Sequence, residues 1–412
     1  MEQHELDDLV DGLKVIDCDS HFTEPADTWS SRVTGRWAER MPVLRTVDGQ
    51  SSWYLDGEVW ASVGGNVIGR DHKRNLGILR LQPFDAIDPS SWSVPERLEL
   101  LDKERIWAQV LYPNGVGFAS NHIFAIDDLE QRRLVLETYN DFLVDVQTES
   151  NERLIPQALL PVWDMDLTVK EMTRMLDKGI RGFTLTDKPE MIDLPELPEP
   201  YFDPMWDLFN ESGAVVNFHI GSGRSREEIE SFRRPEQFQH VPYHRRQPHK
   251  WAHFEQYPQR GNVVVTSQTS FSNMRIIANL CLSNLFDRYP KLKVVSVESG
   301  IGWVPFLLEE MDYAFDDGVV DERERAYAKR RPVEYFHDHI YTMFFFERSA
   351  PERLLDIIGI DHVMVETDIP HPACVYPGAV EHFKRVLAKQ PEDVIRKVLQ
   401  DNAVNLYRLT NV

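Results

Sequence analysis

The sequence is poor in cysteine. Its 412 residues include only Cys18, Cys281 and Cys374, an odd number with no motif spacing. Such a set argues against a disulfide framework and indicates a reducing compartment, so we expect a cytoplasmic protein. Long apolar runs are also missing, since none approaches the roughly 20 residues needed to span a bilayer. The opening residues, MEQHELDDLVDG, are acidic and polar and do not look like a signal peptide.

Positive charge is also scarce. The chain carries 45 Lys and Arg residues against 67 Asp and Glu, a formal net charge of -22. This excess of acid argues against binding to nucleic acid or to an anionic membrane, because both are negatively charged. Internal repeats, low-complexity segments and Gly-rich phosphate loops are missing as well. With 42% hydrophobic residues, the composition is that of a folded globular protein.

What the sequence does contain is a series of short apolar runs bounded by turns. Runs rich in β-branched residues are typical of strands that are buried on both faces of a parallel sheet. They span residues 15–21, 105–113, 154–162, 179–186, 214–221, 292–299, 339–346 and 362–371.

Helical patterns lie between most of these runs. Apolar residues recur every three or four positions in segments 128–149, 166–178, 201–212 and 350–360. Gly179, Gly213 and Gly359 follow at the positions of helix C-caps. Eight strands alternating with helices predict an α/β fold, a (β/α)8 TIM barrel. An open doubly wound sheet is the alternative, and the missing Gly-rich loop argues against it.

We expect one domain over residues 1–412, with two insertions in the barrel. The first, residues 30–100 after strand 1, contains a predicted hairpin around Asp56 and Gly57. The second follows strand 5 and is a lid loop over residues 222–260, rich in His, Arg, Gln and Pro. Long loops of this kind are usually functional lids or small insertions.

Polar residues gather at the ends of four predicted strands, where barrel enzymes carry their chemistry. They are Asp19 and His21 on strand 1, His219 on strand 5, Glu298 on strand 6 and Asp368 on strand 8.

Strict alternation along strand 1 would place Asp17, Asp19 and His21 on one face, with Cys18 and Ser20 on the other. Burying three polar side chains without partners would cost several kcal/mol each, so other groups must hydrogen-bond to them or bind them. Asp17 would lie one layer deeper and hydrogen-bond to the groups above it.

The assembled residues resemble the amidohydrolase superfamily, in particular the amidohydrolase-related family 2 branch typified by aminocarboxymuconate semialdehyde decarboxylase. Members carry a metal-binding X-x-His on strand 1, His on strands 5 and 6, and Asp on strand 8. The resemblance covers roughly residues 15–410. The segments that carry it are DSH at 19–21, NFHIG through His219, ETDIPHP through Asp368 and DNAVNLYRL near the C-terminus.

Departures from that pattern imply a carboxylate-rich site. Asp19 replaces the first His of the usual His-x-His, and Glu298 replaces the strand 6 His. No lysine on strand 4 is placed to form a bridging carbamate, because Lys188 lies beyond the strand, and Glu24 is placed to bridge instead. The metal ligands implied are Asp19, His21, Glu24, His219, Glu298 and Asp368.

Four carboxylates balance two divalent ions, and oxygen-rich ligation suits Mn and Fe better than Zn. We therefore expect two divalent metal ions, Fe/Fe or Mn/Fe, with Zn as the alternative. The pattern is similar to amidohydrolase-fold enzymes that activate O2 at a dinuclear site. It implies a monooxygenase that hydroxylates a small organic acid or thioester with O2 and an external reductant. The alternatives are a metal-dependent hydrolase or non-oxidative decarboxylase, with Asp368 as proton shuttle, and a catalytically silent partner of an active paralogue.

We expect catalytic roles for Glu298, Asp368 and His371, with His371 supporting the site rather than binding metal. A carboxylate, phosphate or coenzyme A group would meet basic residues of the two insertions. We also expect a homo-oligomer or pairing with a paralogous subunit. Predicted substrate contacts are Arg70, His72, Tyr112, Asn114, His244 and Trp303, with further basic candidates Arg74, Arg224, His240, Arg245, Arg246, His249 and His253.

Overall fold

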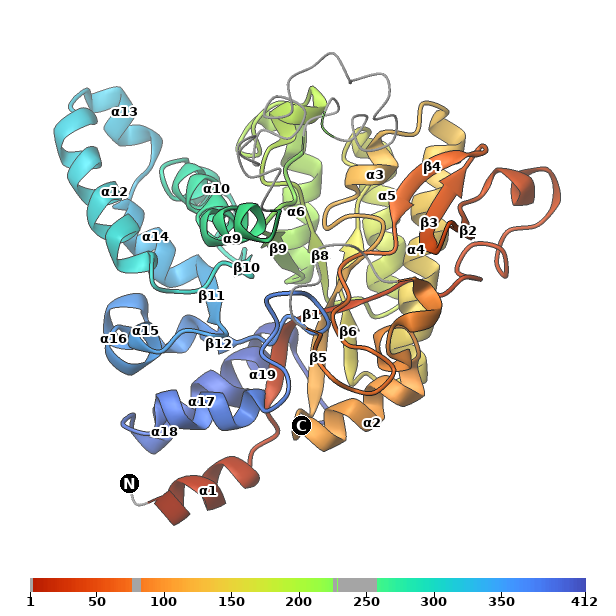
Figure 1. Ribbon diagram of the computed structural model, residues 1–412. Coiled ribbons are helices and arrows are strands. Elements are labelled where there is room, and N and C mark those ends of the chain that lie inside the picture. The colour runs from red at the N-terminus through yellow and green to blue at the C-terminus, as the bar shows by residue number, and fades with distance from the viewer. Residues whose placement is uncertain (1–2, 76–82, 225–227, 229–257) are drawn as a thin grey trace.

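The computed structural model describes residues 3–75, 83–224, 228 and 258–412. Its main element is a nine-stranded sheet in the order β6-β5-β1-β12-β11-β10-β9-β8-β7. The first and last of these, β6 (Leu154–Pro156) and β7 (Ala158–Leu159), are separated in the chain only by Gln157. They are two halves of one strand, so the sheet closes into a barrel (Figure 1). The predicted TIM barrel is confirmed.

The strands coincide with the predicted apolar runs to within a few residues, and every pair in the barrel is parallel. All of their residues are buried, as expected of strands covered on both faces. The remaining barrel strands are β1 (Ile16–Phe22), β5 (Ala108–Pro113), β8 (Gly182–Thr184), β9 (Val215–His219), β10 (Val294–Val297), β11 (Ile340–Phe344) and β12 (Val363–Val365).

Helices surround the barrel (Figure 1). The longer predicted ones form as α4 (Leu129–Glu149), α5 (Met165–Asp177) and α6 (Asp203–Ser212), whereas the pattern at 350–360 divides into α15 (Ser349–Arg353) and α16 (Leu355–Ile358). The others are α1 (Gln3–Asp11), α2 (Val94–Glu104), α3 (Asn121–Phe124), α9 (Pro258–Thr269), α10 (Ser272–Cys281), α11 (Leu285–Arg288), α12 (Val304–Gly318), α13 (Glu322–Tyr327), α14 (Pro332–His339), α17 (Ala379–Leu387), α18 (Glu392–Arg396) and α19 (Asn402–Tyr407).

The first insertion contains a three-stranded antiparallel sheet, β2 (Val43–Val47), β3 (Gln50–Leu55) and β4 (Glu58–Ser62). The predicted hairpin is therefore confirmed. The second insertion is described only at 222–224, 228 and 258–260, so most of the predicted lid lies outside the described residues. Among the helices that the structure describes, none has the length and apolarity to cross a membrane.

The expected alternation along β1 is wrong, because the strand contains an irregularity. Asp17 pairs with Gln109 of β5, but Ser20 pairs with Leu111, so three steps on β1 match two on β5. This is the geometry of a β-bulge. Before the bulge, Ile16 and Cys18 pack in the apolar cluster that fills the barrel, together with residues of α19. Asp17 therefore faces out of the barrel, while Asp19 and His21 turn toward the cluster at its mouth.

Candidate metal centre

Backbone hydrogen bonds fix the end of β1 against the segment after β12. The His21 amide donates to the Ile369 carbonyl at 2.7 Å, and the Asp368 amide donates to the Asp19 carbonyl at 2.9 Å. Glu298 and Asp368 take positive φ values of 53° and 58°. A non-glycine residue in that region is strained, and such strain is common at functional sites. The end of β1 and the residues that follow β10 and β12 are thereby held in a fixed relation.

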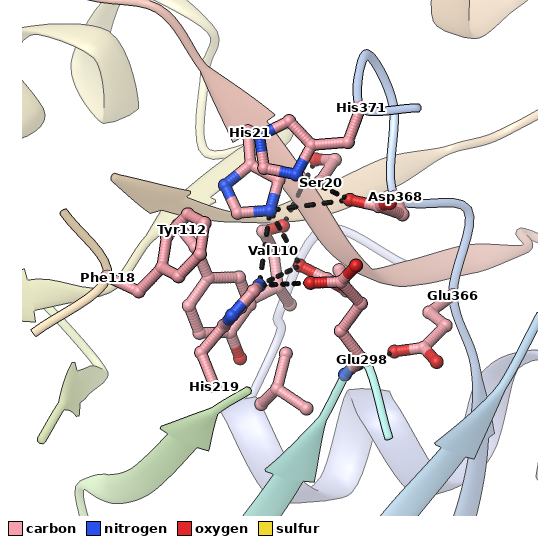
Figure 2. A network of polar contacts seen from close by, with 12 residues as sticks. Ser20, His21, Val110, Tyr112, Phe118, His219, Glu298, Glu366, Asp368 and His371 are labelled. Atoms are coloured by element: carbon pink, nitrogen blue, oxygen red, sulfur yellow. Dashed lines mark hydrogen bonds and ion pairs between the residues drawn. The ribbon is translucent and has the colours of Figure 1, made fainter. Parts of the chain in front are cut away.

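The two histidines present their Nε2 atoms to each other. Nδ1 of His21 lies 3.0 Å from the Pro113 carbonyl, and Nδ1 of His219 lies 2.8 Å from the Ile220 carbonyl. Because each Nδ1 must carry a proton to donate, each neutral ring has a lone pair on Nε2. These two Nε2 atoms are 3.1 Å apart (Figure 2). Facing lone pairs at that distance repel each other unless a cation, either a proton or a metal ion, lies between or beside them.

The carboxylates around these rings lack donors. Both side-chain oxygens of Asp19 and of Asp368 are buried without a hydrogen-bond partner. Oδ1 of Asp368 lies 3.4 Å from the Nε2 atom of His21, and Oε2 of Glu298 lies 3.3 Å from that of His219. A buried carboxylate without a donor or a cation is strongly disfavoured. Two overlapping sets have ligand atoms within 4.8 Å of one another, Asp19–His21–His219–Glu298 and His21–Glu298–Asp368–His371.

The pKa shifts of the clustered acids and imidazoles are those expected of a site that binds a cation. Burial and mutual repulsion of the acids raise the pKa values of Glu298, Glu366 and Asp368 well above their usual range. Burial lowers the pKa of His21 well below its usual value. Burial also opposes the charged form of His219, but Asp19 and Glu298 outweigh it and raise its pKa. The donor set, two imidazoles with several carboxylates, fits a divalent metal ion.

These shifts predict how stability responds to metal and pH. In the metal-free protein the raised pKa values mean that the folded state holds more protons than the unfolded state above about pH 4. Stability of the metal-free protein therefore falls as the pH rises toward those values. A metal ion replaces the protons, so the stabilisation by metal should grow between about pH 5 and 8. At 100 times its Kd, the metal adds about 2.7 kcal/mol.

Thermal unfolding with Mn2+ or with a chelator, measured across this pH range, checks the prediction. A difference in Tm between the two samples that does not change with pH would contradict it.

The structure does not bring Glu24 to the cluster. Its carboxylate accepts hydrogen bonds from the backbone amides of Gly115, at 2.9 and 3.1 Å, and of Val116, at 3.3 Å. Burial raises its pKa to about 7. Among the described residues, Glu24 belongs to neither set of candidate ligands. We therefore leave it out of the proposed ligand set.

Other predicted site residues lie beside the cluster. The His371 ring stacks on His21 with 3.6 Å between ring centroids (Figure 2). Its Nε2 lies 3.1 Å from Oδ1 of Asn114. Tyr112 lies inside the barrel, where its hydroxyl donates to Asn217 at 2.9 Å. Trp303 lines a large cavity next to Glu298.

The basic residues of the first insertion bond to groups outside the cluster, although the charge of Arg74 opposes the rise in the pKa of Asp368. Nε of Arg70 donates to the Asp85 carbonyl, and Nδ1 of His72 pairs with Asp88 at 2.7 Å. Arg74 donates to the Pro372 carbonyl at 2.7 Å, and Arg224 lines a small cavity next to His371. The predicted contacts His240, His244, Arg245, Arg246, His249 and His253 lie outside the described residues.

Two residues beside the cluster were not predicted from the sequence. Phe118 packs on both metal-site rings, with centroid distances of 5.0 Å to His21 and 4.1 Å to His219. Glu366 is buried, and its Oε2 accepts from the Glu298 amide at 2.9 Å (Figure 2). The position of Glu366 just before Thr367 and Asp368 was a usable signal, because a buried acid at a strand end needs a partner. Phe118 follows β5 in a loop, and no pattern singles it out.

A closed parallel barrel with imidazoles and carboxylates at the carboxyl ends of its strands defines a TIM-barrel enzyme with a candidate metal site at the barrel mouth. The model of the Amidohydrolase family matches residues 16–409. The chain belongs to the Amidohydrolase family, which confirms the resemblance to the amidohydrolase superfamily.

Three known proteins show what the chain is similar to. It is 24% identical over 326 residues to gamma-resorcylate decarboxylase of Rhizobium radiobacter, covering 76% of this chain and 86% of that protein. The structure of an amidohydrolase from Mycobacterium avium subsp. paratuberculosis K-10 superposes with a TM-score of 0.69 at 19% identity, over 97% of this chain and 99% of that one. A dihydroxybenzoic acid decarboxylase from Polaromonas sp. JS666, with bound manganese and the inhibitor 2-nitroresorcinol, gives 0.57 at 17% identity, over 97% and 98%.

These findings overturn the monooxygenase prediction. The relatives with a named activity are decarboxylases, which corresponds to the alternative drawn from the sequence rather than to its main reading. The neighbour with a bound metal contains manganese. None of these findings supports a role for O2, an external reductant, iron or a second metal ion.

Proposed function

We propose that the protein is a metal-dependent decarboxylase that removes the carboxyl group of an aromatic hydroxy acid without oxidation. The observation that carries the proposal is the convergence of two Nε2 lone pairs, on His21 and His219, with the unpartnered oxygens of Asp19. The decarboxylase relatives and the manganese of a structural neighbour support the choice of reaction and metal.

In this proposal one ion is held by Asp19, His21, His219 and Glu298. When bound, a divalent cation draws electron density from the substrate carboxyl and phenol oxygens. Phe118 lies against both imidazoles and limits access of water to them.

The neighbouring pair Asp368 and His371 holds a proton. Nδ2 of Asn114 donates to Thr23 at 2.8 Å, so the amide oxygen of Asn114 faces His371. Nε2 of His371 therefore carries a proton, which it donates to that oxygen. Burial lowers the pKa of the ring to about 3, so the ring is neutral and carries no second proton. Its Nδ1 then has a lone pair 3.0 Å from Oδ1 of Asp368. A proton between these two atoms satisfies both groups.

That proton has a use in the reaction. Breaking the bond between ring carbon and carboxyl group releases CO2 and leaves the bonding electron pair on the ring carbon. A proton must then join that carbon to complete the product. We assign its delivery to Oδ1 of Asp368, with His371 as the neighbour that shares it. General acid catalysis of this kind contributes about 10²- to 10⁴-fold.

Release of CO2 from hydroxybenzoic acids tests the function. We expect the full-length protein, stripped of metal and reloaded with Mn2+, to release CO2 and form the corresponding phenol at the same rate with and without O2. Asp19→Asn serves as the control that weakens the metal site. Failure to release CO2 from any 2-hydroxybenzoic acid with the metal bound, or consumption of O2 in step with product, would contradict the proposal.

A further inference from the structure

A large cavity opens beside Glu298, on the side of β10 and β11. Its volume is about 620 Å3. Most of its wall is apolar, and three of the apolar side chains are themselves exposed, Val263 at 66%, Phe271 at 53% and Phe346 at 58%. Exposed large apolar side chains gathered around a cavity mark a surface that binds an apolar group.

The size of the cavity exceeds what one aromatic ring needs. An apolar protein cavity of about 150 Å3 is enough to hold a benzene molecule. The cavity here has about four times that volume. Since Glu298 lies both in the wall and in the proposed ligand set, a substrate held at the metal centre can extend into this space.

Among the described residues, the lining of the large cavity offers no cation to a second anion. Its described lining residues include the acids Glu298 and Glu347 but no Lys, Arg or His. The Glu347 carboxylate is fixed, because it accepts from the amides of Ile301, at 3.0 Å, and Gly302, at 2.8 Å. A Cβ on Gly300, at φ +65°, would come within 2.8 Å of this carboxylate, so glycine at that position lets Glu347 fit.

A second cavity, of about 250 Å3, differs in character. It lies on the side of Asn114 and His371, and Arg224 and His122 contribute to its lining. Polar and basic groups favour an anionic or strongly hydrogen-bonding ligand group there. The apolar body of a substrate would therefore enter the larger cavity.

We propose that the substrate is an aromatic monocarboxylic acid with an apolar body larger than one benzene ring, and that this body occupies the large cavity beside Glu298. The inference rests on the proposed function for the position of the carboxyl group at the metal centre. It adds the substrate class, which excludes a second carboxylate on the apolar body.

A ligand series on the intact, Mn2+-loaded protein tests the inference. The probes are salicylate and salicylates with straight alkyl chains of one to six carbons at the ring position opposite the hydroxyl or next to it. Calorimetry gives Kd without depending on turnover. We expect Kd to fall about fourfold for each added methylene, since burying one CH2 is worth about 0.8 kcal/mol and tenfold in Kd about 1.4 kcal/mol.

Two variants test whether the fall in Kd with chain length arises in the large cavity. Ser270 is half-buried in the cavity wall, so Ser270→Trp should fill the space and remove the gain with chain length. Ser212→Trp is the matched control, because Ser212 is also half-buried at a helix end but does not line the cavity. A chain that ends in a second carboxylate should bind at least tenfold more weakly than the alkyl chain of equal length. Glu347→Gln should narrow that difference and leave alkyl binding unchanged.

The two proposals fail separately. A Kd that stays constant along the alkyl series overturns the substrate class, even if CO2 is released. A Kd that falls along the series without release of CO2 supports the substrate class and overturns the proposed reaction. Equal effects of Ser270→Trp and Ser212→Trp overturn the assignment to this cavity, as does tight binding of the dicarboxylates.

Discussion

Replacing Asp368 by asparagine is expected to lower kcat for decarboxylation by about 10²- to 10⁴-fold while the bound manganese is kept. The amide is similar in shape to the carboxyl group but cannot hand a proton to the ring carbon. The proposed ligands Asp19, His21, His219 and Glu298 are all still present in this variant. Metal content by elemental analysis, together with kcat and KM for CO2 release, measures the two effects independently.

A buried carboxyl group outside the cluster provides the control for this variant. Asp187 is buried, and its Oδ1 accepts from the Ser222 hydroxyl at 2.8 Å, but it belongs to neither candidate ligand set. Asp187→Asn should leave kcat within a few-fold of the unchanged protein. Loss of manganese in Asp368→Asn would show that Asp368 is a ligand, and unchanged kcat with metal bound would remove it from proton transfer.

Most of the barrel could be predicted because local sequence and burial act together there. The run at 214–221 is apolar, bounded by glycines and fully buried as β9, with His219 as its last residue. A polar residue that ends such a strand lies at the rim of the barrel, and His219 is found there in the cluster of candidate ligands. Glu298 and Asp368 were placed by the same reasoning.

The errors came from features that local pattern does not encode. The bulge in β1 depends on the register with β5, which involves residues some 90 positions away along the chain, and it reversed the predicted orientation of Asp17. Glu24 was predicted to bridge two metal ions because no lysine on strand 4 could form a carbamate. That prediction stays untested, but the backbone amides of Gly115 and Val116 already bind the carboxylate.

The mistaken oxygenase prediction followed from Glu298 in place of the strand 6 His, from the missing strand 4 lysine and from a count of the acids. Charge balance for two ions needed four carboxylates in the cluster, and Glu24 was one of them. Without Glu24 three of the four acids remain, Asp19, Glu298 and Asp368. If Asp368 serves as the proton donor, the set Asp19–His21–His219–Glu298 contains two acids and two imidazoles, which balances a single divalent ion. The residue types near a predicted site therefore indicate the number and kind of metal ions only once the structure shows which acids are already bound by backbone amides.

Replacing Arg97 by methionine is expected to lower the free energy of unfolding by about 3–5 kcal/mol, the usual effect of removing one partner from a buried charged network. Arg97 is fully buried in α2. Its guanidinium donates to the His21 carbonyl at 2.8 Å and to Oε1 of Gln109 at 3.0 Å. Nε2 of Gln109 in turn donates to Asp17 at 2.6 Å. Burial lowers the pKa of Arg97 to about 10, so it stays charged at neutral pH.

The network binds both the outward-facing carboxylate of Asp17 and the backbone carbonyl of His21. Methionine fills much of the volume of Arg97 but leaves the His21 carbonyl without this donor and Asp17 without its compensating charge. Arg105→Met is the control: Arg105 pairs with Asp11 at 2.7 Å and with Glu381, but its side chain is 41% exposed, so its loss should cost less than about 1 kcal/mol. Urea titration followed by tryptophan fluorescence measures both variants in the Mn2+-loaded protein. Equal losses in the two variants would mean that Arg97 contributes no more than a surface ion pair, and that the bulge in β1 holds His21 in place without it.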